Sequence, residues 1–552
     1  MKRLIFTSAA AAMALGSGTS AFAQDSASAD EYGRSERSGN GGRNVQVSPY
    51  IEASQLVVAE LSPGDDVVTY TQVAAGVDAS VQGRNNGASV SVRYEYNVGY
   101  GNNVDTDTIS GVARGYASII PQVLTVDAGA LAARTRVDGS GGATLSPLIN
   151  EGSDSQVYSV YGGPSLATRA GDADVTANYR IGYNRVESPD AIVTAPGAAP
   201  VDVFDDSLVQ SAAVRVGTRP GEPLPVGVGI GAGWVQEDVS NLDQRVRDVY
   251  VRGDVTVPVS QSLAVIGGIG YEDVQVSGRD AVLDANGVPV VGADGRFVTD
   301  DSAPRQIAYE TDGLIWDVGV MWRPSSRTVL QAAVGKRYDS TTYHGSFSYA
   351  PNARASFNVS VYDAISGFGN QLTNALANLP TEFTANRNPL TGDVSGCVAS
   401  LEGDNCLSGA LGSVRSAVFR SRGINASYAM QLGQMSAGLG VGYDRRKFIA
   451  APGTVLAGAN GVTDESFYMA AYLNGQVGRS GSFSTNAYAN WLGSGFANAG
   501  DVFSTGGSAS YSRRIINGLS ARAAVALDHL DSDLSEQDLT AASALLGLRY
   551  DF

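Results

Sequence analysis

Histidine is the residue type in this chain best suited to acid–base chemistry, and only two histidines are present. His529 stands next to Asp528 and close to Asp531. A carboxylate that orients an imidazole is the arrangement of a general base, which would suit a hydrolase. The residues two and four positions before His529 are Leu527 and Val525, so no nucleophile shares its strand face. We therefore favour a non-catalytic ring at the end of a strand, and we expect His344 to lie in a long polar loop.

The two cysteines, Cys397 and Cys406, are separated by eight residues within one long polar segment. Two thiolates without a nearby histidine make a poor metal site, whereas two thiols in an oxidising compartment pair readily. We expect a small disulfide loop, and we expect no metal and no cofactor.

Glycine runs such as Gly227, Gly229, Gly231 and Gly233 imitate phosphate-binding loops only superficially. They occupy every second position, so they line one face of a strand and permit close approach of a loop or a neighbouring tyrosine ring. We find no catalytic constellation in the chain and predict that it is not an enzyme.

The composition indicates one repeated kind of segment rather than several soluble domains. The chain has 552 residues with 67 glycines and 25 tyrosines, and only 17% of its residues are charged. Asp and Glu outnumber Lys and Arg by 55 to 38, which argues against a nucleic-acid partner. Beyond residue 23 no apolar run is long enough for a transmembrane helix.

The N-terminal segment has the features of an export signal. Lys2 and Arg3 precede a short apolar run, which ends at Ala21-Phe22-Ala23. We expect residues 1–23 to be a cleaved signal peptide. Residues 24–44 are rich in Ser, Gly, Asp and Arg, and we expect a flexible periplasmic leader.

From residue 45 onward, apolar and polar residues alternate. Val90, Val92 and Tyr94 share one parity, whereas Ser91 and Arg93 share the other, as expected for a strand with one apolar face. Such segments run for about 10–16 residues, longer than the usual strand of a β-sandwich. Their connectors alternate between tight turns and long polar loops. This pattern predicts an all-β fold over residues 45–552, a transmembrane antiparallel barrel of about 22 strands with short periplasmic turns and long extracellular loops.

The last residues provide a specific signal. Gly547, Tyr550 and Phe552 lie in an alternating segment that ends the chain, and they match the C-terminal signature of bacterial outer-membrane barrels. This resemblance implies recognition by the barrel-assembly machinery and residence among outer-membrane lipids of a Gram-negative bacterium.

A further resemblance rests on Val47-Ser48-Pro49-Tyr50-Ile51-Glu52-Ala53 and on Val73-Ala74-Ala75-Gly76-Val77-Asp78-Ala79. With the polar leader, these segments resemble the outer-membrane barrels associated with exosortase/PEP-CTERM sorting and exopolysaccharide loci, which are related to porin-like barrels. The resemblance implies a cell-envelope role and contact with polysaccharide export components, not a reaction.

Strand parity assigns a set of charged residues of both signs to the lumen. A mixed lining suits polar solutes or a polar plug and has no strong ion preference. The expected lumen-lining residues are Asp78, Arg93, Glu95, Asp127, Arg180, Arg215, Asp317 and Arg513.

The longest loop, residues 366–413, is the segment expected to narrow so wide a barrel. Within Gln371 to Leu379, apolar residues recur at helical spacing, and Pro380 ends the pattern. We expect this loop to fold inward near the glycine-lined strand faces; the alternative is an external flap.

Two functions from different classes remain open. The first is an outer-membrane pore or export conduit for polar solutes, with exopolysaccharide as the cargo implied by the resemblance. The second is a non-conducting structural barrel whose surface loops bind a partner.

Overall fold

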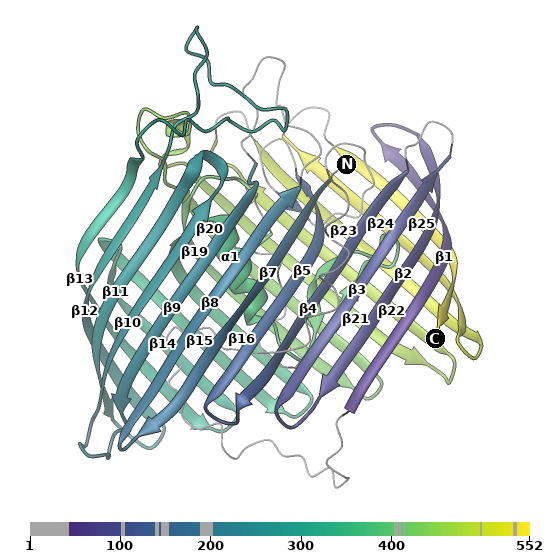
Figure 1. Ribbon diagram of the computed structural model, residues 1–552. Helices are drawn as coiled ribbons and strands as arrows, with labels where there is room; N and C mark the ends of the chain where they lie inside the picture. The colour runs from purple at the N-terminus through teal and green to yellow at the C-terminus, as the bar shows by residue number, and fades with distance from the viewer. Residues whose placement is uncertain are drawn as a thin grey trace.

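The molecule, described here from a computed structural model, is one closed ring of antiparallel strands (Figure 1). The structure describes residues 44–552 except 101–104, 138–142, 145–153, 188–202, 402–406, 408–409, 412–413, 497–499 and 534–537. The expected signal peptide and nearly all of the leader lie outside these residues. The ring has 22 strands, as the alternating pattern predicted.

Each wall strand pairs with its neighbours in sequence, and the order is that of an up-and-down barrel. The first eleven are β1 (Asn44–Ser62), β2 (Val67–Gln82), β3 (Asn86–Gly99), β4 (Thr106–Ile120), β5 (Leu124–Val137), β7 (Asp154–Ala170), β8 (Ala173–Glu187), β9 (Asp206–Thr218), β10 (Gly227–Val239), β11 (Gln244–Pro258) and β12 (Leu263–Gly278). The other eleven are β13 (Gln306–Ser325), β14 (Thr328–Arg337), β15 (Ser340–Asn352), β16 (Ala355–Ser366), β19 (Phe419–Leu432), β20 (Met435–Phe448), β21 (Thr463–Val477), β22 (Gly481–Gly493), β23 (Asp501–Ile516), β24 (Leu519–Ser532) and β25 (Leu539–Asp551).

The ring closes where the first strand pairs with the last. β1 and β25 are in register from Tyr50 opposite Asp551 to Ser62 opposite Thr540. Closure leaves no unpaired sheet edge between these strands, which a barrel in lipid requires. Because the strand number is even, β1 begins and β25 ends at the same rim.

The outer face is apolar, as the parity analysis requires. On β13, the side chains of Leu314, Trp316 and Val318 are exposed by 60%, 46% and 51%. Their paired neighbours across the sheet, such as Tyr271 opposite Leu314, are exposed as well. This outward band is the surface that faces lipid.

The two rims differ in the length of their connections. At one rim the strands are joined by tight turns, in which Gly171 and Gly433 adopt positive φ. At the other rim, long segments such as residues 279–305 and 449–462 join the strands. The alternation of short and long connectors is therefore confirmed. His344, however, lies within β15 opposite Ala333 rather than in a long loop, because the β14–β15 connection at this rim is a two-residue turn.

The smaller elements lie outside the wall pairing described above. They are the two-residue strand β6 (Ala143–Thr144), the helix α1 (Phe368–Asn378), the two strands β17 (Thr384–Arg387) and β18 (Val394–Ala399), and the 3-10 turns Asn241–Asp243 and Ala457–Ala459. Among the described residues, no α-helix is long and apolar enough to cross a membrane.

Many glycines of the inner face are covered by tyrosine rings from the next strand. Gly233 lies opposite Tyr250, and Gly438 lies opposite Tyr472. A Cβ at either glycine would come within 2.4 Å of that ring. Of the expected row of glycines on β10, Gly233 makes room for a tyrosine and Gly229 for the Arg215 side chain.

Candidate functional site: an insertion inside the barrel

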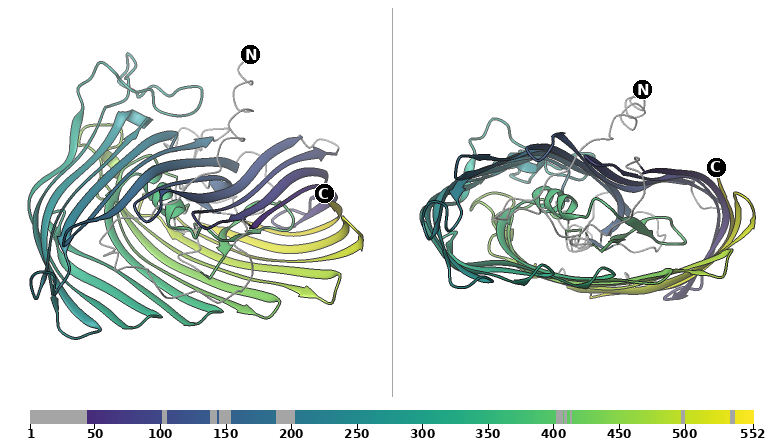
Figure 2. Two further views of the ribbon diagram at one scale, coloured as in Figure 1. Left: turned by 60° about the horizontal axis from the view of Figure 1, so that its bottom comes forward. Right: turned by 90° about the horizontal axis from the view of Figure 1, so that it is seen from below.

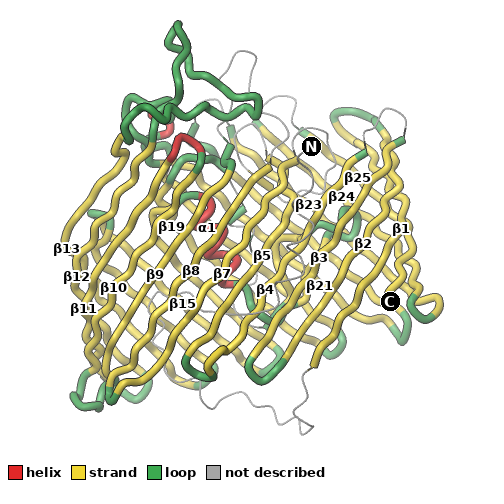
Figure 3. Tube along the Cα trace, in the orientation of Figure 1, coloured by secondary structure: helices red, strands yellow, loops and turns green. Residues whose placement is uncertain are grey.

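Residues 367–418 connect β16 to β19, and we call them the insertion; its described residues include α1 and the β17–β18 hairpin, which occupy the interior of the ring (Figure 2). Seen along the barrel axis, α1 and the β17–β18 hairpin both lie within the flattened wall (Figure 2). In the side view, the helix sits at mid-height between the front and back strands (Figure 3). The insertion therefore fills space that would otherwise belong to the lumen.

The helix α1 contacts the wall through an apolar face. Phe368, Leu372 and Leu376 are completely buried. They pack in one cluster with inner-face residues of five wall strands, among them Leu131, Val157, Val186 and Val239. Apolar side chains on the inner wall would be unfavourable in contact with water, and α1 covers them with an apolar face of its own. The helical spacing noted within residues 371–379 corresponds to α1, which begins at Phe368, three residues before Gln371.

Polar contacts fix the first turn of α1. The buried carboxylate of Glu237 on β10 accepts hydrogen bonds from the backbone N–H groups of Gly367 (2.7 Å) and Asn370 (3.1 Å). These are donors that an isolated helix start leaves without partners. On the next turn, Asn184 donates to the Thr373 hydroxyl at 3.0 Å.

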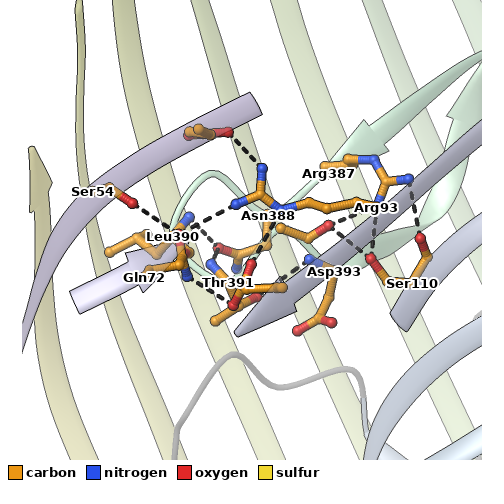
Figure 4. A network of polar contacts seen from close by, with 12 residues as sticks. Ser54, Gln72, Arg93, Ser110, Arg387, Asn388, Leu390, Thr391 and Asp393 are labelled. Atoms are coloured by element: carbon orange, nitrogen blue, oxygen red, sulfur yellow. Dashed lines mark hydrogen bonds and ion pairs between the residues drawn. The ribbon is translucent and has the colours of Figure 1, made fainter. Parts of the chain in front are cut away.

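The hairpin β17–β18 contacts the wall through hydrogen bonds and ion pairs (Figure 4). Arg134 on β5 donates to Asp393 from Nε (3.0 Å) and from a terminal nitrogen (2.5 Å). Arg387 donates to the hydroxyls of Ser91 (3.0 Å) and Ser110 (2.8 Å). We call residues 386–393, which include these contacts, the hairpin tip.

A buried charge cluster lies on the wall beneath the tip. Arg93 contacts Glu52 at 2.5 Å and Glu95 at 3.1 Å, and Arg522 donates to Glu52 at 2.8 Å. A Cβ at Gly392 would lie 2.2 Å from the Arg93 guanidinium, so the tip needs a glycine there, which also adopts a φ of +70°. Buried charges are costly unless they are paired, and here each has a partner of opposite sign.

The tip also reaches strands on the other side of β1. Asn474 on β21 donates to the side chain of Asn386 at 2.8 Å, and Asn486 on β22 donates to the carbonyl of Arg387 at 3.3 Å. Leu390 packs with Leu56, Ala524, Ala526 and Leu545. The tip thus spans the interior between the two long sides of the flattened ring.

Elsewhere on the inner wall, four charged residues form a ladder across β9, β11 and β13. Arg215 donates to Asp254 at 2.7 Å, Arg252 contacts the same carboxylate at 3.1 Å, and Arg252 also donates to Asp317 at 2.7 Å. Gly229 and Gly268 lie under the two guanidinium groups, where a Cβ would collide with them. The ladder has no net charge; Arg215, Arg252 and Asp317 are partly exposed, whereas Asp254 is buried.

The remaining lumen candidates have separate surroundings. Asp78 accepts a hydrogen bond from Ser91 and lies 3.6 Å from Arg549. Asp127 is buried on the inner face of β5. Arg180 lies over the ring of Tyr161 and donates to Asn374 of α1 at 3.4 Å.

The assignment of Arg513 to the lumen is wrong. Arg513 pairs with Ala521 and shares its strand face with Tyr511, which is exposed on the outer surface. The serines of β23 take the inner face, and Arg513 lies three residues before the end of the strand. A cation at that height can extend towards lipid headgroups rather than into the lumen.

The other candidates are placed as follows. Cys397 is disulfide-bonded, while Cys406 lies outside the described residues. Gly547, Tyr550 and Phe552 belong to β25 and its end; the rings of Tyr550 and Phe552 pack edge to face at 5.1 Å. His529 is exposed, and its Nδ1 lies 2.8 Å from the Thr540 hydroxyl. Among the described residues, no group of three metal-ligating side chains comes together.

The inner wall is covered unevenly. Beneath the hairpin, the serines Ser89, Ser91 and Ser110 are 3–4% exposed. On the inner face of β15, by contrast, His344, Ser346 and Ser348 are all exposed. The insertion therefore covers one part of the wall and leaves another part open to solvent.

Glu237, Arg134 and Asp393 were not among the candidates from sequence. Each lies in a segment that offers no motif, and its partner lies more than a hundred residues away. No pattern in the sequence joins them.

No protein-family model and no curated protein sequence matches the chain. Solved structures with similarity include the FrpB iron transporter of Neisseria meningitidis, with 10% identity, a TM-score of 0.42, and coverage of 91% of this chain and 81% of that one. The ferric-catecholate import receptor Fiu of E. coli has 10% identity, a TM-score of 0.45 and the same coverages. The copper transporter OprC has 13% identity, a TM-score of 0.38, and coverage of 92% and 81%. Similarity at this level assigns no substrate to this chain.

Proposed function

We propose that the chain is an outer-membrane transport barrel for polar solutes, in which the insertion narrows the lumen. The apolar outer face suits residence in lipid, and the expected signal peptide and C-terminal strand suit export and assembly at the outer membrane. An unobstructed ring of this strand number would be wide enough to breach the permeability barrier. The insertion removes much of that width.

One observation supports the proposal above the others. The inner face of β15 exposes His344, Ser346 and Ser348, whereas the serines under the hairpin are buried. A scaffold barrel has no need of a hydrated polar interior surface beside an ordered plug. A conduit does, because hydroxyl and imidazole groups replace water around a passing polar solute.

The cargo that the family resemblance implies is exopolysaccharide, and export is the direction we propose. The paired charges of the inner wall agree with a neutral or weakly charged cargo. A partner from a polysaccharide export system would then deliver the polymer at the rim of tight turns.

Planar-bilayer recording and liposome flux test this proposal together. Purified protein should conduct ions in discrete steps and admit neutral oligosaccharides into liposomes. The protein must show the heat-modifiable mobility of a folded barrel. If such protein gives neither ion conductance nor oligosaccharide flux, the non-conducting scaffold is favoured instead. Loss of surface polysaccharide on deletion of the gene, restored by the intact gene, would support the cargo.

A further inference from the structure

The two parts of the insertion are held to the wall by different kinds of contact. α1 is held chiefly by buried apolar side chains, among them Leu372 and Leu376. The base of the hairpin joins the same cluster through Val398. The tip is held chiefly by polar groups, with Leu390 as its buried apolar side chain.

These two kinds of contact respond differently to separation. Moving α1 away from the wall would expose apolar surface on both sides to water, which is unfavourable in proportion to the area. Moving the tip away would replace its hydrogen bonds with bonds to water, so the net cost of each is small. The tip is thus the part of the insertion that can separate at low cost.

The charge cluster on the wall beneath the tip keeps its ion pairs when the tip moves away and water enters. Arg93 keeps both Glu52 and Glu95 as partners when Asp393 leaves, and Arg522 keeps Glu52. Arg134 exchanges Asp393 for water, whereas this cluster keeps its pairs and can be hydrated without rearrangement. The tip spans from Ser110 on β4 to Asn474 on β21, so its departure would clear the space between them.

We infer that the hairpin tip, residues 386–393, is the moving gate of this barrel, and that α1 with the hairpin base is its fixed anchor. This inference rests on the proposed conduit for its purpose, but the movement itself can be measured without conductance. The gate swings about the apolar base of the hairpin and breaks the Arg134–Asp393 and Arg387–Ser110 contacts.

Cysteine labelling distinguishes the gate from the anchor. Ser110 lies under the tip and Ser207 lies under α1, and they are 3% and 0% exposed. The variants S110C and S207C make the same chemical change, and Cys397 is protected by its disulfide. With a water-soluble maleimide and folded protein, we expect S110C to react at least tenfold faster than S207C.

Second-site changes show whether labelling reports movement of the tip. Adding D393N should speed labelling of S110C several-fold, whereas adding E237Q, which weakens the start of α1, should leave it unchanged. Equal rates for S110C and S207C, or acceleration by E237Q alone, would overturn the inference. Rapid labelling of S110C in a protein that does not conduct would leave the moving tip intact and refute only the conduit.

A crosslink provides the matching functional assay. Cysteines at Asn386 and Asn474, whose side chains are hydrogen-bonded at 2.8 Å, would lock the tip to β21. Cysteines at Thr373 and Asn184 would lock α1 to β8 and serve as the control. We expect the first lock to abolish large openings reversibly and the second to have no effect; a wild-type sample with and without reductant controls for the native disulfide. Unchanged openings in the first locked protein would contradict a moving tip.

Discussion

Arg134 and Asp393 are 259 residues apart in the chain, yet Arg134 donates two hydrogen bonds to the Asp393 carboxylate inside the barrel. Both side chains are largely buried, at 8% and 12% exposure. The pair joins the wall to the tip of an insertion that begins far away in sequence, and it is one of several polar contacts between the two.

Breaking this pair should therefore weaken the closed state. Asp393→Asn removes the carboxylate charge that the Arg134 guanidinium contacts while the tip is closed, at a cost of about 3 kcal/mol. We expect the fraction of time in large openings to rise at least tenfold in single-channel records. The control is Asp174→Asn, which removes a partner of Arg219 at the tight-turn rim. An unchanged open fraction in D393N would show that the pair does not hold the gate.

The apolar anchor predicts a different mutational effect. Leu372→Ala removes a completely buried side chain from the cluster under α1 and should destabilise the docked insertion by about 2–5 kcal/mol. Asn378→Ala changes an exposed residue of the same helix and should cost little. Limited proteolysis of folded protein should cut the insertion much faster in L372A than in N378A, and equal rates would contradict burial of this helix face.

The charge ladder predicts ion selectivity. Asp254 is shared by Arg215 and Arg252, so Asp254→Asn leaves a local positive excess on the inner wall. In a salt gradient, the reversal potential should shift towards anion preference relative to wild type. Asp301→Asn changes an exposed loop carboxylate and should produce no such shift. A D254N channel that stays unselective would place the ladder away from the ion path.

The alternation of apolar and polar residues was sufficient to predict the strands of the wall. Lipid on one side and water on the other impose the same two-residue period on every strand. Val90 and Val92 face outward and Arg93 faces inward, as the pattern indicated. The count of strands and the alternation of connectors followed from the same constraint.

The interior was harder to predict. Whether an inner-face residue is polar or apolar depends on what packs against it, and strand parity does not identify that neighbour. Leu131 and Val157 are apolar on the lumen side because α1 covers them, an arrangement that no local pattern reveals. Helical spacing indicated the helix but not the strands against which it packs. Arg513 was assigned to the wrong parity of its strand: it shares a face with Tyr511, whose exposed ring marks the outer side of β23.

The terminal strand predicts an assembly defect. Replacing Tyr550 and Phe552 with Ser removes the aromatic pair at the end of β25, the strand that closes the ring against β1. We expect the variant to be missing from the outer-membrane fraction and to lose heat-modifiable mobility. Ile516→Ser, at an exposed strand end elsewhere, should assemble normally. Normal assembly of the double variant would refute the role assigned to Tyr550 and Phe552.

The central claim, that the insertion restricts a conducting lumen, is tested most directly by single-channel conductance of a variant that lacks residues 366–413. With Ile365 joined to Val414 through a short linker and the barrel shown to be folded, we predict a conductance several-fold above that of wild type, together with greater sensitivity of cells to large antibiotics. A folded deletion variant whose conductance equals that of wild type would contradict the account.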